Sequence, residues 1–212
     1  MIAIINYEAG NLRSVERAFH QLNIPCRIMQ DQQDISAADR IIFPGVGAAG
    51  KAMEDLKRLG LDSVLQQAFQ AGKPILGICL GAQIILDRSE ENEVECLGLL
   101  AGKAVRFPHP LGSPDEKTLK IPHMGWNALT VMRNHPVLEG LTSDDEFYFV
   151  HSYFPLPDEP SRVIAETHYG ISFPSVIGVR NLIAVQFHPE KSGNAGLRIL
   201  QNFYRWDGRH VE

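Results

Sequence analysis

One cysteine of this chain lies in a local sequence that suits nucleophilic chemistry. Cys79 is flanked by Gly77 and Gly81 and follows the apolar run 74–76. The pattern predicts a strand that turns sharply into a helix at the cysteine, a corner too tight for larger side chains on either side. A thiol at such a corner, near a helix N-terminus, is favoured as the nucleophilic thiolate. We expect Cys79 to be a catalytic nucleophile rather than a buried structural cysteine, since sites in open α/β sheets lie where strands end.

A base and a carboxylate that could orient it are encoded near the C-terminus. His188 follows the apolar run 182–185 and precedes Pro189 and Glu190. Because proline restricts the backbone, the imidazole and the carboxylate hold a defined relation. A bond from one imidazole nitrogen to Glu190 would set the tautomer and leave the other nitrogen for Cys79. The sequence therefore predicts a Cys-His-Glu triad, against the alternatives of a core histidine and a solvated surface carboxylate.

Acyl transfer also needs hydrogen-bond donors for the oxyanion that develops during the reaction. The turn Pro44–Gly47 follows an apolar strand, and its glycines would let backbone amides face a cavity. A plain strand-to-helix turn explains the same residues equally well, so both interpretations stay open. The second donor would be the amide of Leu80, directly after the nucleophile.

Composition and charge exclude several other classes of protein. The chain has 212 residues, 44% hydrophobic and 21% charged, as expected for one globular domain spanning 1–212. A net charge of −5 gives no indication of nucleic-acid or anionic-membrane binding, and no apolar run is long enough to cross a bilayer. Three widely spaced cysteines without a CxxC pair argue against a disulfide framework or a zinc site. We expect a cytoplasmic protein with no metal.

The elements that must position these residues change in type along the chain. Up to residue 79, strands alternate with helices, which predicts a doubly wound, flavodoxin-like, mostly parallel sheet with helices on both faces. In the second half, shorter runs and more turn signals predict additional, mostly antiparallel strands. The expected strands are 2–5, 25–29, 40–43, 74–79, 103–107, 126–131, 146–150, 162–166, 176–180 and 182–186. The expected helices are 11–22, 52–71 and 194–206, and the segment 109–120 is expected to be a loop.

With these residues assembled, the sequence resembles the class I glutamine amidotransferases that use a Cys-His-Glu triad. The resemblance rests on Gly77–Gln83, Phe187–Glu190 and Pro44–Gly47, and with the strand pattern it covers nearly the whole chain. Further segments are similar to one branch of that family, the glutaminase subunits of imidazole glycerol phosphate synthase from histidine biosynthesis. These segments are Gly10–Val15, Pro122–Asn127, Tyr148–Tyr153, Tyr169–Gly170 and His188–Gly193. The Pro-His-Met-Gly-Trp-Asn run is the most discriminating, because related amidotransferases for anthranilate, GMP or carbamoyl phosphate lack it.

The resemblance implies a mechanism that needs no cofactor. Cys79 would attack the side-chain amide of glutamine, His188 would pass a proton to the leaving ammonia, and Glu190 would orient His188. The glutamyl thioester that forms would be hydrolysed to glutamate, with the amides of Val46 and Leu80 as oxyanion donors. The residues implied to hold the amino-acid moiety of glutamine are Gly47, Gln83, Ser152 and Tyr153.

The resemblance also implies a partner protein. Ammonia would pass to a separate (β/α)₈ cyclase subunit, which makes imidazole glycerol phosphate and an aminoimidazole carboxamide ribotide. The chain is too short to hold a synthetase domain as well. The residues expected to face the cyclase are Asn11, His123, Met124, Trp126 and Lys191. From their chemistry alone, residues 122–127 could equally be core or an exposed aromatic anchor.

Two positions depart from the family's pattern. Ala82 stands where this family commonly has Met, and Ala49 lies near a position where many relatives carry Phe, so we expect altered packing near the nucleophile helix and the oxyanion loop.

Two other functions are alternatives. An amidotransferase subunit for aminodeoxychorismate or anthranilate is disfavoured by the segment 122–127 and by the lack of His at position 82. A non-catalytic flavodoxin-like binding module is disfavoured by the intact triad.

Overall fold

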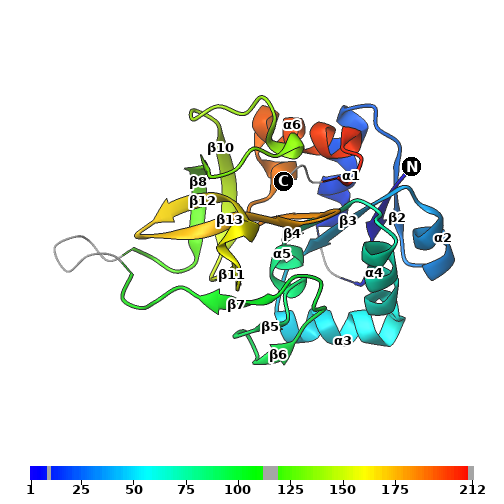
Figure 1. Ribbon diagram of the computed structural model, residues 1–212, viewed down its shortest axis with the longest axis horizontal. Helices are drawn as coiled ribbons and strands as arrows, with labels where there is room; N and C mark the ends of the chain where they lie inside the picture. Colours follow the sequence, from blue (N-terminus) through cyan, green and yellow to red (C-terminus); the bar gives the residue numbers. More distant parts are fainter. Residues whose placement is uncertain (9–10, 112–118, 210–212) are drawn as a thin grey trace.

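A single eight-stranded sheet forms the centre of the computed structural model, which describes residues 1–8, 11–111 and 119–209. Its strands are β1 (Ile2–Ile5), β2 (Cys26–Met29), β3 (Arg40–Gly45), β4 (Ile75–Cys79), β9 (Thr130–Val131), β12 (Val163–Tyr169), β13 (Ile171–Val179) and β14 (Leu182–Val185). They lie in the order β2-β1-β3-β4-β14-β13-β12-β9 (Figure 1). The strands from β2 to β14 are parallel, and the last three continue the sheet in antiparallel pairing.

Helices cover both faces of this sheet. They are α1 (Leu12–Gln21), α2 (Gln32–Ala37), α3 (Ala49–Leu59), α4 (Leu61–Gln70), α5 (Leu80–Ile84) and α6 (Gly193–Arg205). Figure 1 shows α1 and α6 on one side of the sheet and α3, α4 and α5 on the other. The doubly wound α/β fold predicted from the sequence is thereby confirmed.

The alternation of side chains along the strands divides the interior into two cores. In β1, Ile2 and Ile4 pack on the side of α1 and α6, whereas Ala3 and Ile5 pack on the side of α3 and α4. Successive side chains of a strand point to opposite faces, so a strand buried on both faces must be apolar throughout. We call these two groups of buried side chains the α1/α6 core and the α3/α4 core.

Two smaller sheets complete the second half of the chain. One pairs β8 (His123–Ala128) with β10 (Glu146–His151), and the other has the order β11-β7-β5-β6. The strands of this second, four-stranded sheet are β5 (Arg88–Ser89), β6 (Val94–Glu95), β7 (Gly102–Arg106) and β11 (Tyr153–Pro157). Short 3₁₀ turns are η1 (Pro136–Leu138), η2 (Pro160–Arg162) and η3 (Pro189–Lys191). Among the residues described, no helix is both long and apolar enough to cross a membrane.

Several predicted elements differ from those observed. The single helix expected over 52–71 is two helices, because Gly60 adopts a left-handed conformation (φ 67°) that ends α3. The strand expected over 126–131 is divided between β8 and β9, which belong to different sheets. Helix α2 was not predicted, although Asp31 caps it by accepting hydrogen bonds from the amides of Gln33 and Asp34.

The short strands β5 and β6, the proline-containing β11 and the 3₁₀ turns η1, η2 and η3 were also not predicted. Most of the loop expected over 109–120 lies outside the described residues, and a single bridge joins Leu111 to Leu119 at its ends.

Candidate active site

Cys79 occupies the sharp strand-to-helix corner that the sequence predicts. It is the last residue of β4 and the residue before α5, with a backbone φ of 55° and ψ of −108°. A positive φ is uncommon for a residue with a side chain and tends to occur at functional sites. The corner also needs a glycine next to it, because a Cβ on Gly81 would lie 2.0 Å from the backbone oxygen of Phe43. The close packing of β3 against α5 therefore holds the thiol at the carboxyl end of the sheet.

His188 and Glu190 form a buried pair at the start of η3. The Nδ1 atom of His188 lies 2.8 Å from Oε1 of Glu190, and the Glu190 side chain is completely buried. The surface-carboxylate alternative for Glu190 is therefore wrong. Since an ionised carboxylate only accepts hydrogen bonds, Nδ1 carries a proton. The Nε2 atom of His188 is buried without a hydrogen-bond partner among the described residues, which leaves it free to serve the thiol.

The electrostatics of His188 favour its protonated form. Burial alone would lower the pKa of His188, but the neighbouring Cys79 sulfur and the Glu190 carboxylate outweigh burial and raise it to about 10. An imidazolium beside a cysteine is the arrangement in which the sulfur reacts as a thiolate.

Asn11 lies against the triad, a position that the sequence did not reveal. Its Nδ2 atom donates a hydrogen bond to Oε1 of Glu190, the same oxygen that His188 contacts. Asn11 precedes α1 and adopts a left-handed backbone (φ 72°), which directs its side chain toward the carboxylate. The sequence predicts that Asn11 faces a partner. The structure places its side chain in contact with Glu190.

A cavity of about 340 Å³ opens beside the thiol. It collects the predicted residues Val46, Gly47, Cys79, Leu80, Gln83, Ser152, Tyr153 and His188, which come from distant parts of the sequence. A larger hollow of about 800 Å³ lies around residues 131–141, and none of the predicted site residues lines it. The smaller cavity is therefore the candidate active site, since it combines space with a nucleophile and a base.

Two buried side-chain amides, those of Gln83 and Gln186, connect the lining of this cavity to the thiol. The Nε2 atom of Gln83 donates to the backbone oxygen of Tyr153 (2.8 Å) and to Oε1 of Gln186 (3.0 Å). Gln186 in turn places its Nε2 3.7 Å from the sulfur of Cys79. Gln186 was not predicted as a site residue, although a polar residue directly after the apolar run 182–185 is a signal that the sequence contains.

Glu91 is the one carboxylate among the described residues that line the cavity. Its Oε2 accepts a hydrogen bond from the amide of Ala49 (2.8 Å), the first residue of α3, and Asn92 accepts from the amide of Gly50 (3.3 Å). Ala49 therefore belongs to the helix that follows the Val46–Ala48 turn, not to the turn itself. The sequence carries no signal for Glu91, which lies in a run of acidic and polar residues.

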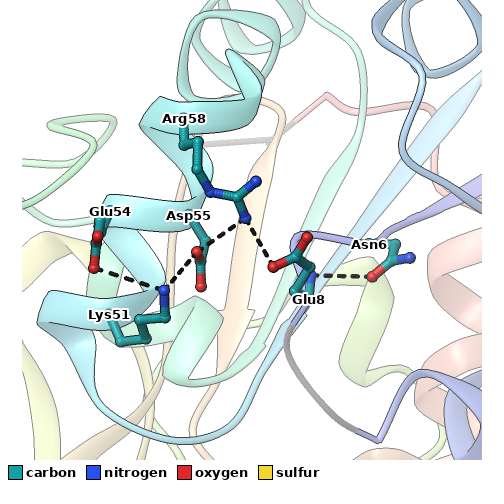
Figure 2. A network of polar contacts seen from close by, with 6 residues as sticks. All are labelled: Asn6, Glu8, Lys51, Glu54, Asp55 and Arg58. Atoms are coloured by element: carbon teal, nitrogen blue, oxygen red, sulfur yellow. Dashed lines mark hydrogen bonds and ion pairs between the residues drawn. The ribbon is translucent and has the colours of Figure 1, made fainter.

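The turn after β1 is tied to the helix that begins behind the Val46–Ala48 turn. Figure 2 shows Glu8 paired with Arg58 of α3 (2.7 Å), which also contacts Asp55 (3.1 Å). Lys51 completes the network through Asp55 (2.9 Å), and this bond is the main cause of the lowered pKa of Asp55. The turn after β1 is therefore tied to the C-terminal end of α3 through Glu8 and Arg58.

The residues expected to face a partner divide into exposed and buried ones. Met124 and Trp126 are 62% and 53% exposed, whereas His123 is buried, because alternate residues of β8 point to opposite sides. Lys191 is exposed and its Nζ lies 5.8 Å from the ring centroid of Tyr148. The expectation that the His123 side chain faces a partner is therefore wrong.

His123 instead belongs to a buried histidine pair behind the cavity. Its Nδ1 lies 3.1 Å from Nε2 of His151, whose own Nδ1 lies 2.8 Å from the backbone oxygen of Tyr153. Burial lowers the pKa of His123 to about 4 and that of His151 to about 3, so both are neutral near pH 7. The pair thereby helps to fix the Ser152–Tyr153 wall of the cavity.

Comparison with known proteins agrees with this geometry. The family model described as glutamine amidotransferase class-I matches residues 3–206. The chain is 50% identical over 206 residues to the imidazole glycerol phosphate synthase subunit HisH of Nitratidesulfovibrio vulgaris, covering 97% of this chain and 96% of that protein. It is 47% identical to the protein of the same name from Desulfovibrio desulfuricans, over the full length of both.

Solved structures share the fold at lower sequence identity. A crystal structure of a glutamine amidotransferase superposes with a TM-score of 0.74 at 18% identity, covering 98% of this chain and all of that one. The structure of PurLQS from Thermotoga maritima gives 0.71 at 18% identity, covering 96% of this chain and 97% of that one. On its sequence and its fold, the chain belongs to the class I glutamine amidotransferases and, within them, to the family of HisH subunits.

Proposed function

We propose that this chain is the glutaminase subunit of an imidazole glycerol phosphate synthase and hydrolyses glutamine to glutamate and ammonia. The observation that carries the proposal is the convergence of Cys79, with its strained backbone, and the buried His188–Glu190 pair on one cavity. The high identity to HisH proteins over the whole chain supports the same function.

The triad divides the chemistry between its three side chains. The Cys79 thiolate attacks the side-chain carbonyl carbon of glutamine, and the protonated His188 gives its Nε2 proton to the leaving ammonia. The neutral imidazole then takes a proton from the water that hydrolyses the glutamyl thioester, which restores both groups. Glu190, held by Asn11, keeps His188 oriented and stabilises its charge.

Backbone amides of two adjacent strand ends would stabilise the tetrahedral intermediate. Gly45 and Cys79 are direct neighbours in the parallel pairing of β3 and β4. The next residues, Val46 and Leu80, therefore leave the sheet side by side at the nucleophile. Leu80 is the first residue of α5, where an amide has no acceptor within the helix. We assign the oxyanion hole to these two amides.

The polar lining of the cavity suits the amino-acid part of glutamine. Glu91 offers a negative charge for the α-ammonium group, in addition to its bond with Ala49. Gln83, which is oriented by its bonds to Tyr153 and Gln186, and the Gly47 and Ser152–Tyr153 backbones complete the substrate site.

The ammonia product requires a second subunit, which we propose to be a (β/α)₈ cyclase. HisH relatives are named as subunits of a synthase, and the exposed Met124 and Trp126 supply an apolar surface beside the cavity. We also propose that residues 1–212 act as one amidotransferase domain in the cytoplasm, where the cysteines Cys26, Cys79 and Cys96 stay reduced.

Glutamate release tests this function directly. It would be measured for the chain alone, with the cyclase subunit, and with the cyclase and its ribotide ligand. We expect a low rate that rises only in the last condition and falls by several orders of magnitude in Cys79→Ala. Synthesis from added ammonia should survive in Cys79→Ala, since it does not use the thiol.

Two results would contradict the proposal. A high rate that ignores the cyclase would indicate a different amidotransferase pathway or a free-standing glutaminase. Loss of ammonia-dependent synthesis in Cys79→Ala would show that the division of labour between the subunits is wrong.

A further inference from the structure

The hydroxyl group of Tyr7 is buried and has no hydrogen-bond partner in the part of the chain that the structure describes. Tyr7 is 1% exposed, and its Oη bonds to no other group among the described residues. The large majority of buried polar side-chain atoms in proteins are hydrogen-bonded, so an exception near a reactive centre calls for a function. A phenylalanine would fill the same space without an unpaired oxygen.

The hydroxyl lies against the residue that precedes the oxyanion turn. Tyr7 follows β1, its ring packs on Phe43 (centroids 5.5 Å apart), and a Cβ on Gly45 would lie 2.3 Å from Tyr7 Oη. That added Cβ would also lie 3.1 Å from the backbone nitrogen of Gly81. The phenol therefore reaches the junction of β3 and α5, the two elements that carry the proposed oxyanion donors.

Tyr7 and the nucleophile approach this junction from opposite faces of the sheet. Tyr7 belongs to the α3/α4 core, whereas Cys79 belongs to the α1/α6 core. In a trans peptide the carbonyl and the amide point in opposite directions. A hydrogen bond from Tyr7 to the Gly45 carbonyl would therefore turn the amide of Val46, in the same peptide group, toward the face of Cys79.

The residues beside Tyr7 hold its backbone in place. The amide of Asn6 donates to the Met29 oxygen (2.8 Å), and the amide of Glu8 donates to Oδ1 of Asn6 (3.0 Å). Glu8 also pairs with Arg58, as Figure 2 shows. A side chain between two anchored neighbours can act as a fixed hydrogen-bond donor.

The phenol stays protonated throughout the range in which the protein works. Burial, and after it the negative charges of Cys79 and Asp55, raise the pKa of Tyr7 far above its ordinary value. The hydroxyl can therefore act as a donor in every state of the reaction.

We propose that Tyr7 is a positioning residue for the oxyanion hole: its hydroxyl donates to the Gly45 carbonyl when the hole forms and so aims the Val46 amide at the tetrahedral intermediate. The inference rests on the proposed glutaminase function. It assigns to Tyr7 no contact with the substrate, so its effect falls on the rate of the chemical step and not on glutamine binding.

The test compares Tyr7→Phe with Tyr204→Phe, the same change at a partly exposed position on α6. Glutamate release would be measured with the cyclase and its ribotide ligand, together with ammonia-dependent synthesis, thermal unfolding and the alkylation rate of Cys79. For Tyr7→Phe we expect kcat to fall about tenfold or more with KM unchanged. The unfolding midpoint should stay or rise, because an unpaired buried hydroxyl is lost. Cys79 alkylation, ammonia-dependent synthesis and all properties of Tyr204→Phe should match the wild type.

Two outcomes would overturn the inference. A Tyr7→Phe variant with wild-type kcat would show that the hydroxyl does not act in the reaction. A fall in kcat together with a lower unfolding midpoint and a higher KM would make the hydroxyl a structural group. A wild-type chain that releases no glutamate, and does not differ from Cys79→Ala, would contradict the glutaminase function itself, so the two failures are distinguishable.

Discussion

At the residue scale, the side chains that we propose to react are held in place by neighbours to which we assign no chemical step. Two donors, His188 and Asn11, share one oxygen of Glu190, which is buried with its second oxygen unpaired among the described residues. Charge-assisted bonds of this kind are stronger than those between neutral groups. The orientation of the His188 imidazole therefore depends on Asn11 as well as on Glu190.

Replacing Asn11 distinguishes a role in the triad from a role at an interface. In Asn11→Ala, Glu190 loses a donor, and a hydrogen bond to a charged group is worth about 1.5–3 kcal/mol, so we expect kcat for glutamine hydrolysis to fall roughly tenfold or more. Steady-state glutamate release with the partner present measures this, with Ser14→Ala on the same helix as the control. Unchanged kcat with weaker binding to the cyclase would instead support the interface role predicted from the sequence.

At the scale of elements, the site depends on how closely β3, β4 and α5 approach one another. The β3 backbone passes so near α5 that only glycine fits at position 81. The first amides of α3 are capped by Glu91 and Asn92 from the turn between β5 and β6. The Val46–Ala48 turn is thus fixed at both ends, by the sheet before it and by a capped helix after it.

Adding a methyl group at position 81 tests this close packing. In Gly81→Ala the new Cβ would meet the Phe43 oxygen at 2.0 Å, so backbone must move, and we expect a loss of about 3 kcal/mol in the free energy of unfolding. Gly50→Ala is the matched control on α3, where the nearest atoms to the added Cβ belong to the Asn92 side chain and lie at 3.1 Å or more. Denaturant unfolding of both variants gives the comparison, and equal stabilities would contradict the packing argument.

The buried pair of His123 and His151 predicts a loss of stability in acid. Both pKa values lie below the ordinary value of 6.5, at about 4 and about 3. Below pH 6.5 the unfolded chain therefore binds protons that the folded chain does not. The stability contributed by the neutral pair is complete above that pH and is lost as the pH falls toward 4 and then 3, by up to about 1.4 kcal/mol per pH unit for each histidine.

Denaturant unfolding at several pH values between 7 and 4 measures this effect. His123→Gln should show a smaller decrease in stability with falling pH than the wild type. His168→Gln, at an exposed position, should retain the wild-type decrease. Parallel pH profiles for the wild type and His123→Gln would mean that the pair does not stay neutral in the folded chain.

At the scale of the whole molecule, the site forms where distant chain segments meet at one edge of the sheet. Val46 follows β3, Cys79 ends β4 and His188 comes shortly after β14, and these three strands are adjacent in the sheet (Figure 1). The cavity wall comes from the junction of β10 and β11. The strand β8, paired with β10, presents Met124 and Trp126 to solvent next to that wall.

Removing the exposed indole tests where a partner binds. Trp126→Ala should weaken assembly with the cyclase by about 2 kcal/mol, or roughly thirtyfold in Kd, because exposed Trp is typical of interface hot spots. The coupling of glutamine hydrolysis to synthesis by the cyclase should fall more than glutamine binding does. A binding titration measures Kd, and Met132→Ala, at a position that is 55% exposed and lies outside the β8–β10 pair, is the control. Unchanged affinity and coupling would exclude Trp126 from the interface.

Local sequence was sufficient for the elements whose signals lie within a few residues. The parallel half of the sheet follows from continuous apolar runs, and the corner at Cys79 follows from the glycines on either side of it. The end of α3 at Gly60 and the start of α2 at Asp31 also have local signals, a glycine and a capping aspartate. The short strands β5 and β6 could not be predicted, because two residues carry no periodicity and are ordered only by pairing.

The amino-acid sequence alone was enough to predict Cys79, His188 and Glu190 as nucleophile, base and carboxylate, since that prediction depends on residue type and on position just after an apolar strand. Only the folded chain showed that Asn11 contacts Glu190, that Glu91 faces the cavity, that His123 is interior and that the Tyr7 hydroxyl is unpaired. Each of those facts concerns residues far apart in sequence. Their contacts arise from the packing of strands and helices against one another, which no local pattern specifies.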